Sequence, residues 1–172
     1  GRIEQFRFAG SVTWDYADVV ARGVDRRGMP DEQPATAGDD VYAVDHFGDR
    51  IAEQVDGGYD RVVSSVSYRL PDEVEELSLA GTLNLSATGN ERDNLIRGND
   101  GANALAGAGG HDTLLGGRGD DRYYLSGKDS GEGEDTVVEA VDEGDDSVIV
   151  DNWTYTLPDN VENLTASGLG YY

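Results

Sequence analysis

Apolar side chains recur every nine residues through the middle of the chain. Between residues 89 and 124 the sequence divides into four units that each open with glycine: GNERDNLIR, GNDGANALA, GAGGHDTLL and GGRGDDRYY. The eighth place of each unit is apolar: Ile96, Leu105, Leu114 and Tyr123. A unit of this length is too short for a helix and a return, but it suits a glycine turn followed by a short strand. The pattern predicts that the eighth residue points inward while its two neighbours point outward.

Every unit also has Asn or Asp at its sixth place, namely Asn94, Asn103, Asp112 and Asp121. Two successive units turn in opposite directions and complete one coil, so Asn94 is expected to lie over Asp112 and Asn103 over Asp121. Each stacked pair would offer side-chain oxygens together with inward backbone carbonyls. Calcium takes six to eight oxygen ligands and suits such a cage, whereas magnesium prefers a smaller octahedron. Zinc would lack its usual nitrogen and sulfur ligands.

The core of this pattern, Gly-x-Asp-x-apolar, recurs outside the four units. Further copies are GDDVY (38–42), GYDRV (58–62), GEDTV (133–137) and GDDSV (144–148). Their aspartates lack an obvious partner 18 residues away. We therefore consider them weaker candidates for metal ligands than the sixth-place residues. These aspartates are Asp40, Asp60, Asp135 and Asp146.

A longer repeat overlies the short one and divides the chain. Residues 51–81 resemble residues 137–168 through the shared skeleton E-x-V-D-x-G, a β-branched run, and Y-x-L-P-D-x-V-E-x-L. Each copy follows an Asp-Asp-x-Tyr opening, at 39–42 and 120–123. We predict two strands and a short helix capped by Asp15 in 1–24, a linker in 25–37, a first β spacer in 38–88, the nonapeptide block in 89–124 and a second, truncated β spacer in 125–172.

The charge balance narrows the range of partners. With 35 acidic and 13 basic residues the net charge is −22, so the surface repels nucleic acid and anionic membranes and attracts cations. The chain has no Cys, which excludes disulfides and thiolate metal sites and favours an oxygen-bound metal as the staple of the fold. No apolar run approaches the length of a membrane span, and we expect no membrane insertion.

The sequence shows no pattern typical of a catalytic site. His46 and His111 are its only histidines, and no nucleophile elbow, zinc-binding helix or phosphate loop is present. We therefore predict that the chain is not an enzyme.

The four units resemble the calcium-binding nonapeptides of RTX (repeats-in-toxin), or haemolysin-type, proteins. GGRGDDRYY fits the pattern at every defined place, and GAGGHDTLL departs only at Ala108. The resemblance implies an all-β fold, a right-handed parallel β-roll (β-solenoid) of glycine-rich nonapeptides flanked by β-rich spacer repeats. It also implies calcium ligands from the sixth-place side chains and from backbone carbonyls of paired turns. One site would use Asn90, Arg92, Asn94, Gly107, Gly109 and Asp112, and the other Asn99, Gly101, Asn103, Gly116, Arg118 and Asp121.

The resemblance further implies a function. The chain would be a calcium-binding structural module of a bacterial protein exported by type I secretion, and its folding would depend on extracellular calcium. Its partners would be calcium ions and neighbouring repeats of the same parent chain. Two alternatives stay open. One is a calcium-dependent adhesin or carbohydrate-binding stalk, with Trp14 or Trp153 against a glycan or cell-surface ligand. The other is the non-catalytic C-terminal appendage of a secreted protease, lipase or epimerase.

Overall fold

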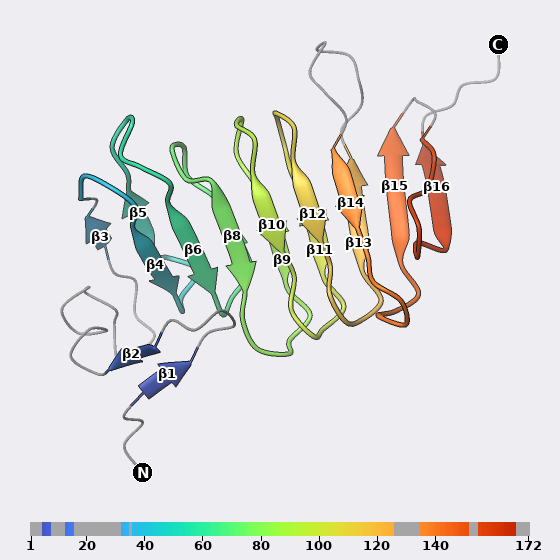
Figure 1. The fold of residues 1–172 in the computed structure, drawn as a ribbon, viewed down its shortest axis with the longest axis horizontal. Coiled ribbons are helices and arrows are strands. Elements are labelled where there is room, and N and C mark those ends of the chain that lie inside the picture. Colours follow the sequence, from blue (N-terminus) through green and yellow to red (C-terminus); the bar gives the residue numbers. More distant parts are fainter. Residues whose placement is uncertain are drawn as a thin grey trace.

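The protein is a two-sheet solenoid built from parallel strands. The computed structural model describes residues 5–7, 13–15, 32–34, 36–125, 135–151 and 155–167, and these residues contain strands and turns but no helix. Successive coils lie side by side along the long axis, from β4 near the N-terminal end to β16 near the C-terminal end (Figure 1). The all-β, parallel β-roll predicted from the sequence is confirmed. Within the described residues no helix has the length and apolar character needed to cross a membrane.

From β6 to β15, successive strands alternate between two six-stranded sheets. The first sheet, in chain order, consists of β4 (Val41–Val44), β6 (Arg61–Ser64), β8 (Glu76–Leu79), β10 (Leu95–Arg97), β12 (Thr113–Leu115) and β14 (Thr136–Val138). The second consists of β7 (Tyr68–Arg69), β9 (Ser86–Thr88), β11 (Ala104–Ala106), β13 (Arg122–Leu125), β15 (Ser147–Asp151) and β16 (Asn163–Ser167). The predicted spacers therefore add strands to the same two sheets as the nonapeptides.

Smaller strand pairs lie near the N-terminal end. The two short strands expected in residues 1–24 form an antiparallel pair, β1 (Gln5–Arg7) with β2 (Thr13–Asp15). Within the predicted linker, β3 (Glu32–Pro34) pairs in parallel with β5 (Arg50–Ala52). The turn expected at Ala9-Gly10 and the helix expected to follow Asp15 lie outside the described residues.

The core is a pair of apolar columns, one along each sheet. The eighth-place residues Ile96, Leu105, Leu114 and Tyr123 are all fully buried, as predicted. Spacer residues continue the columns, because Leu77 pairs with Ile96 in register. In the nonapeptide block the strand register repeats every 18 residues, whereas the spacer coils are longer or shorter than this.

Candidate calcium site

The sixth-place side chains of the nonapeptides lie inside the turns and stack as their spacing predicts. Asn94, Asn103, Asp112 and Asp121 are between 1% and 3% exposed. Asp112 Oδ1 accepts a hydrogen bond from the backbone N–H of Asn94 at 2.7 Å, and Asp121 Oδ1 accepts one from Asn103 at 2.6 Å. Each carboxylate thus uses one oxygen to join its own coil to the preceding one. Its second oxygen is left for another partner.

Glycine at the first place of a unit makes room for the carboxylate. A Cβ at Gly107 would collide with Oδ2 of Asp112, and a Cβ at Gly116 would collide with Oδ2 of Asp121. The same Cβ at Gly116 would also meet an Oε1 atom of Glu139 at 2.5 Å. The repeated glycine is needed here because the buried carboxylate lies directly against the backbone.

The two asparagine-containing turns satisfy their own polar atoms. Asn94 Oδ1 accepts the N–H of Asn90, and its Nδ2 donates to the carbonyl of Val74 at 3.1 Å. Asn103 Oδ1 accepts the N–H of Asn99, and its Nδ2 donates to Asn99 Oδ1 at 3.0 Å. In both turns the side-chain amide both accepts and donates a hydrogen bond, so the polar atoms of Asn94 and Asn103 have partners within the protein.

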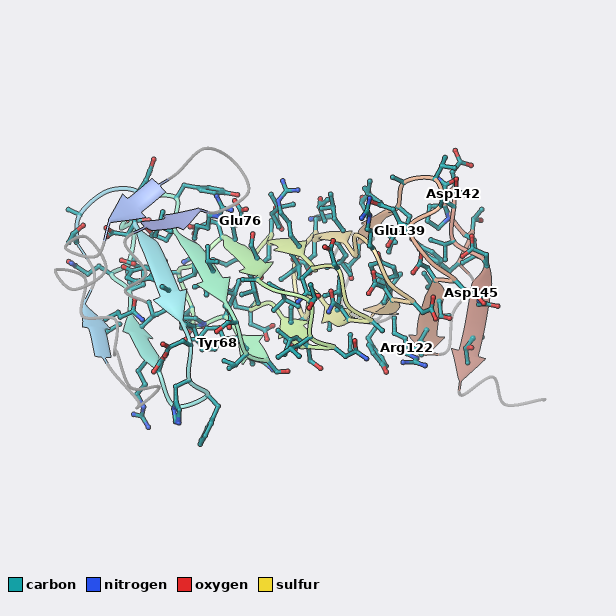
Figure 2. All side chains as sticks on the ribbon, turned by 90° about the horizontal axis from the view of Figure 1, so that it is seen from below. Tyr68, Glu76, Arg122, Glu139, Asp142 and Asp145 are labelled. Atoms are coloured by element: carbon teal, nitrogen blue, oxygen red, sulfur yellow. The ribbon has the colours of Figure 1, made fainter. Side chains whose placement is uncertain are left out.

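The aspartate-containing turns are different, because carboxylates converge there. Oxygen atoms of Asp121, Glu139 and Asp146 all lie within 4.8 Å of one another. Asp146 Oδ1 accepts the N–H of Asp121 at 2.8 Å, and Glu139 accepts the hydroxyl of Tyr123. The second oxygens of all three carboxylates are buried and accept no hydrogen bond from any residue that the structure describes. Glu139 lies at the C-terminal part of the solenoid, near the exposed Asp142 and Asp145 (Figure 2).

Comparison with known families concerns the nonapeptide block. Residues 88–123 match the family model described as the RTX calcium-binding nonapeptide repeat, in four copies. The chain carries RTX-type calcium-binding repeats. Neither the curated proteins nor the solved structures include a significant match to the chain. The RTX block and the β-solenoid fold together make the chain a calcium-binding repeat module.

The carboxylates at the C-terminal end of the RTX block fit calcium. A hard cation prefers an all-oxygen donor set that includes carboxylates. Three carboxylates converge at this point, and each has one buried oxygen without a hydrogen bond in the described part of the chain. Burial raises the pKa of Asp121 to about 7 and the pKa of Glu139 to about 8, and the negative charges of neighbouring carboxylates add to both shifts. Burial likewise raises the pKa values of Asp146 and Asp112. Each of these carboxylates is therefore costly to keep charged without a compensating cation.

The isolated motif copies find partners after all, but at spacings other than 18. Asp135 accepts the N–H of Asp112 at a separation of 23 residues, and Asp146 accepts that of Asp121 at 25. Neither interval is that of two nonapeptides, so the fixed interval of 18 residues did not reveal the pairing. Sequence reasoning also missed Glu139. The signal for it was the glutamate that opens the E-x-V-D-x-G skeleton in both copies of the long repeat.

The backbone carbonyls expected as ligands stay a prediction. The carbonyl of Asn90 accepts the N–H of Gly109 at 2.9 Å, so the stacked turns approach closely enough to share hydrogen bonds. Arg92 and Arg118 have exposed side chains, and the guanidinium of Arg92 pairs with Glu73. All of the predicted carbonyl donors lie in turns of the RTX block: Asn90, Arg92, Gly107, Gly109, Asn99, Gly101, Gly116 and Arg118.

Proposed function

We propose that this module folds, or completes its folding, only when calcium neutralises its buried carboxylates. The observation that carries the proposal is the group of Asp121, Glu139 and Asp146. Each of these carboxylates has one buried oxygen that accepts no hydrogen bond from the described residues. Two unit charges at 4.8 Å, the upper limit of the distances between these oxygens, repel by about 3 kcal/mol at an effective dielectric constant of 20. Without calcium the folded state must therefore either keep these charges or take up protons at pH 7, and both reduce the roughly 5–15 kcal/mol that stabilises an ordinary domain.

Calcium reverses this balance because it binds the folded state and not the unfolded one. Its binding free energy then adds to the free energy of folding. Calcium-binding modules that work outside cells bind with dissociation constants of about 10⁻⁴–10⁻³ M, and we place this module in that range. It would stay unfolded where calcium is scarce and fold where calcium is plentiful.

This dependence suits a bacterial protein that leaves the cell by type I secretion. A chain held unfolded by its own carboxylates in the calcium-poor cytosol would be competent for export and would fold outside. The absence of Cys and the net charge of −22 fit a secreted fold stapled by cations instead of disulfides. We infer that the module is a structural part of its parent protein and has no catalytic role.

The test is a calcium titration of the chain followed by far-UV circular dichroism. Starting in chelator and rising to about 10 mM calcium, a range that spans the affinities expected for such modules, we expect a cooperative gain of β signal. Magnesium over the same range should give little or none. A β spectrum that is already complete in excess chelator would refute calcium-coupled folding.

A further inference from the structure

The long repeat places the same side chains at a second point of the solenoid, outside the RTX block. At the first point, Asp121 and Tyr123 are separated by one residue, and Glu139 and Asp146 by six. The first copy of the repeat preserves both spacings with Asp40, Tyr42, Glu53 and Asp60. The family match covers residues 88–123 and includes none of these four.

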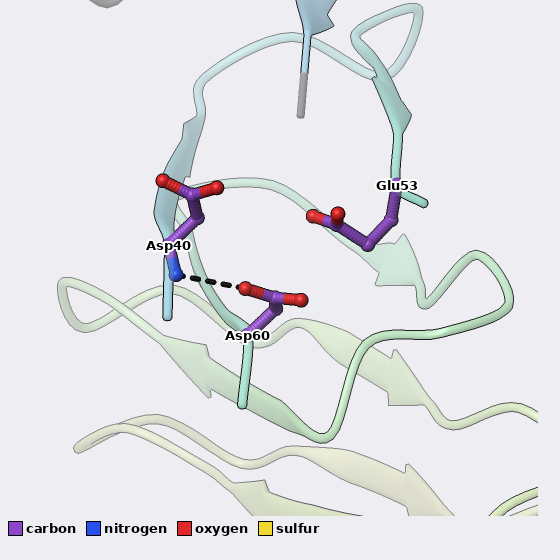
Figure 3. A group of neighbouring side chains, drawn as sticks. All are labelled: Asp40, Glu53 and Asp60. Atoms are coloured by element: carbon purple, nitrogen blue, oxygen red, sulfur yellow. Dashed lines mark hydrogen bonds between the residues drawn. The ribbon is translucent and has the colours of Figure 1, made fainter. Parts of the chain in front are cut away.

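The second point also brings three carboxylates together, although Asp40 and Glu53 are only partly buried. Oxygen atoms of Asp40, Glu53 and Asp60 all lie within 4.8 Å of one another. Their side chains converge from three segments: Asp40 precedes β4, Glu53 follows β5 and Asp60 precedes β6 (Figure 3). Asp60 Oδ1 accepts the N–H of Asp40 at 2.7 Å, just as Asp146 does from Asp121.

The tyrosine also has the same partner in both places. The hydroxyl of Tyr42 donates to Glu53, as the hydroxyl of Tyr123 donates to Glu139. Three residues after each glutamate, the aspartate has a positive φ, 58° at Asp56 and 62° at Asp142. This shared turn aims each glutamate back at the two aspartates.

The backbone around Asp60 repeats the stacking of the RTX turns. Gly58 has a φ of 148°, and a Cβ there would lie 2.5 Å from the carbonyl carbon of Gly38 in the coil before. Gly119 has a φ of 115°, and its Cβ would lie 2.7 Å from the same atom of Gly101. The turn before β6 therefore packs on its neighbour as an RTX turn does, although the two coils are 20 residues apart.

A buried, unpartnered oxygen points to a ligand at this second site. Asp60 is fully buried, and its Oδ2 accepts no hydrogen bond from any residue in the described part of the chain. Burial also raises the pKa of Asp60. The carboxylate of Asp40 has hydrogen-bond donors, because the N–H and hydroxyl of Thr36 both donate to its Oδ2. A cation held between the three carboxylates would compensate the buried charge of Asp60.

We propose that Asp40, Glu53 and Asp60 bind one calcium ion at a site separate from the RTX block. The ligand atoms are all oxygens, which bind hard cations better than soft metals. Three carboxylates favour calcium over magnesium, because magnesium gives up its bound water less readily. The ion would tie β4, β5 and β6 together at the N-terminal end of the solenoid. The inference goes beyond the proposed function because no nonapeptide residue contributes a ligand.

The experiment counts the calcium ions bound by the full chain, by equilibrium dialysis with calcium alone. Asp60→Asn and Glu53→Gln should each bind one ion fewer than the unmodified chain. Glu53→Gln retains the acceptor for Tyr42 and is the milder change. The matched control is Asp56→Asn, which removes one exposed charge at a positive φ that asparagine tolerates. The control should bind as many calcium ions as the unmodified chain.

The outcomes separate this inference from the proposed function. If both site variants have a native circular dichroism spectrum and bind as many ions as the control, the second site does not exist. If Asp112→Asn lowers the count while Asp60→Asn does not, calcium binding by the RTX block stands and the second site is refuted. If the unmodified chain binds no calcium at all, both proposals fall.

Discussion

Glu139 offers the sharpest test of the idea that the buried carboxylates around Asp121 need a cation. Replacing it in Glu139→Gln removes one charge from the group around Asp121 and changes little else. The glutamine Oε1 can still accept the hydroxyl of Tyr123, and its new amide can donate to the oxygens of Asp121 and Asp146 that lack hydrogen bonds. The substitution should therefore stabilise the fold without calcium and weaken its response to calcium.

The size of the effect follows from the pKa of Glu139. Burial raises this pKa from 4.5 to about 8, so at pH 7 the calcium-free folded state must take up a proton that the unfolded chain does not bind. Protonating a group of ordinary pKa 4.5 at pH 7 costs about 3 kcal/mol. Glutamine removes this cost, so the free energy of unfolding in chelator should rise by about 3 kcal/mol. In saturating calcium it should fall, because one ligand is lost.

Both effects are measured by urea denaturation followed by circular dichroism at a series of calcium concentrations up to about 10 mM, well above the dissociation constant expected for such modules. Extrapolation to zero calcium gives the calcium-free value even where the chain is unfolded in chelator. The matched control is Asp142→Asn, an exposed aspartate in the same turn with a φ of 62°. The control removes the same charge and should change neither value by more than about 0.5 kcal/mol. The reasoning is refuted if Glu139→Gln destabilises the chain equally in chelator and in calcium, since that is the behaviour of a purely structural residue.

Two further predictions concern the same site. Gly116→Ala should raise the calcium concentration needed for folding at least tenfold, because its Cβ would collide with Asp121 and crowd Glu139; a calcium titration by circular dichroism measures this, and an unchanged midpoint would contradict the packing. In chelator, the free energy of unfolding should rise as the pH falls from 8 to 5, since the raised pKa values of Asp121 and Glu139 make the folded state bind more protons over this range. In saturating calcium the trend should reverse because protons compete with the ion, and the same sign in both conditions would contradict a shared site.

The sequence predicted those features that depend on a fixed interval. The interval of nine gave the strands, the inward eighth residues and the stacking of Asn94 over Asp112, because each consecutive unit is one turn and one strand. The parallel β-roll follows from the same interval. That the predicted spacers would add strands to the same two sheets was not foreseen. It depends on apolar residues such as Val62 and Leu77 falling in register with the nonapeptide columns, which no local pattern specifies.

What the sequence did not reveal depends on turns of variable length. Asp135 and Asp146 were named as candidate ligands but left without partners, since the coils that carry them are 23 and 25 residues long. Glu53 and Glu139 were visible in the long repeat, yet their role depends on a turn that folds each glutamate back toward aspartates on other segments. Spacing within one strand or turn cannot show that convergence.

The distribution of asparagine and aspartate along the solenoid indicates which of its turns need calcium. The amide of Asn94 donates to the carbonyl of Val74 in the neighbouring coil, and the amide of Asn103 donates to Asn99 within its own turn. At Asp60 and at Asp121, carboxylates face one another and no such donor is supplied. The amides of Asn94 and Asn103 therefore need less added positive charge than the carboxylates of Asp60, Asp112 and Asp121, each of which has a buried oxygen without a hydrogen bond in the described part of the chain. Calcium would then act at these carboxylates, and the solenoid as a whole would fold once their negative charge is neutralised.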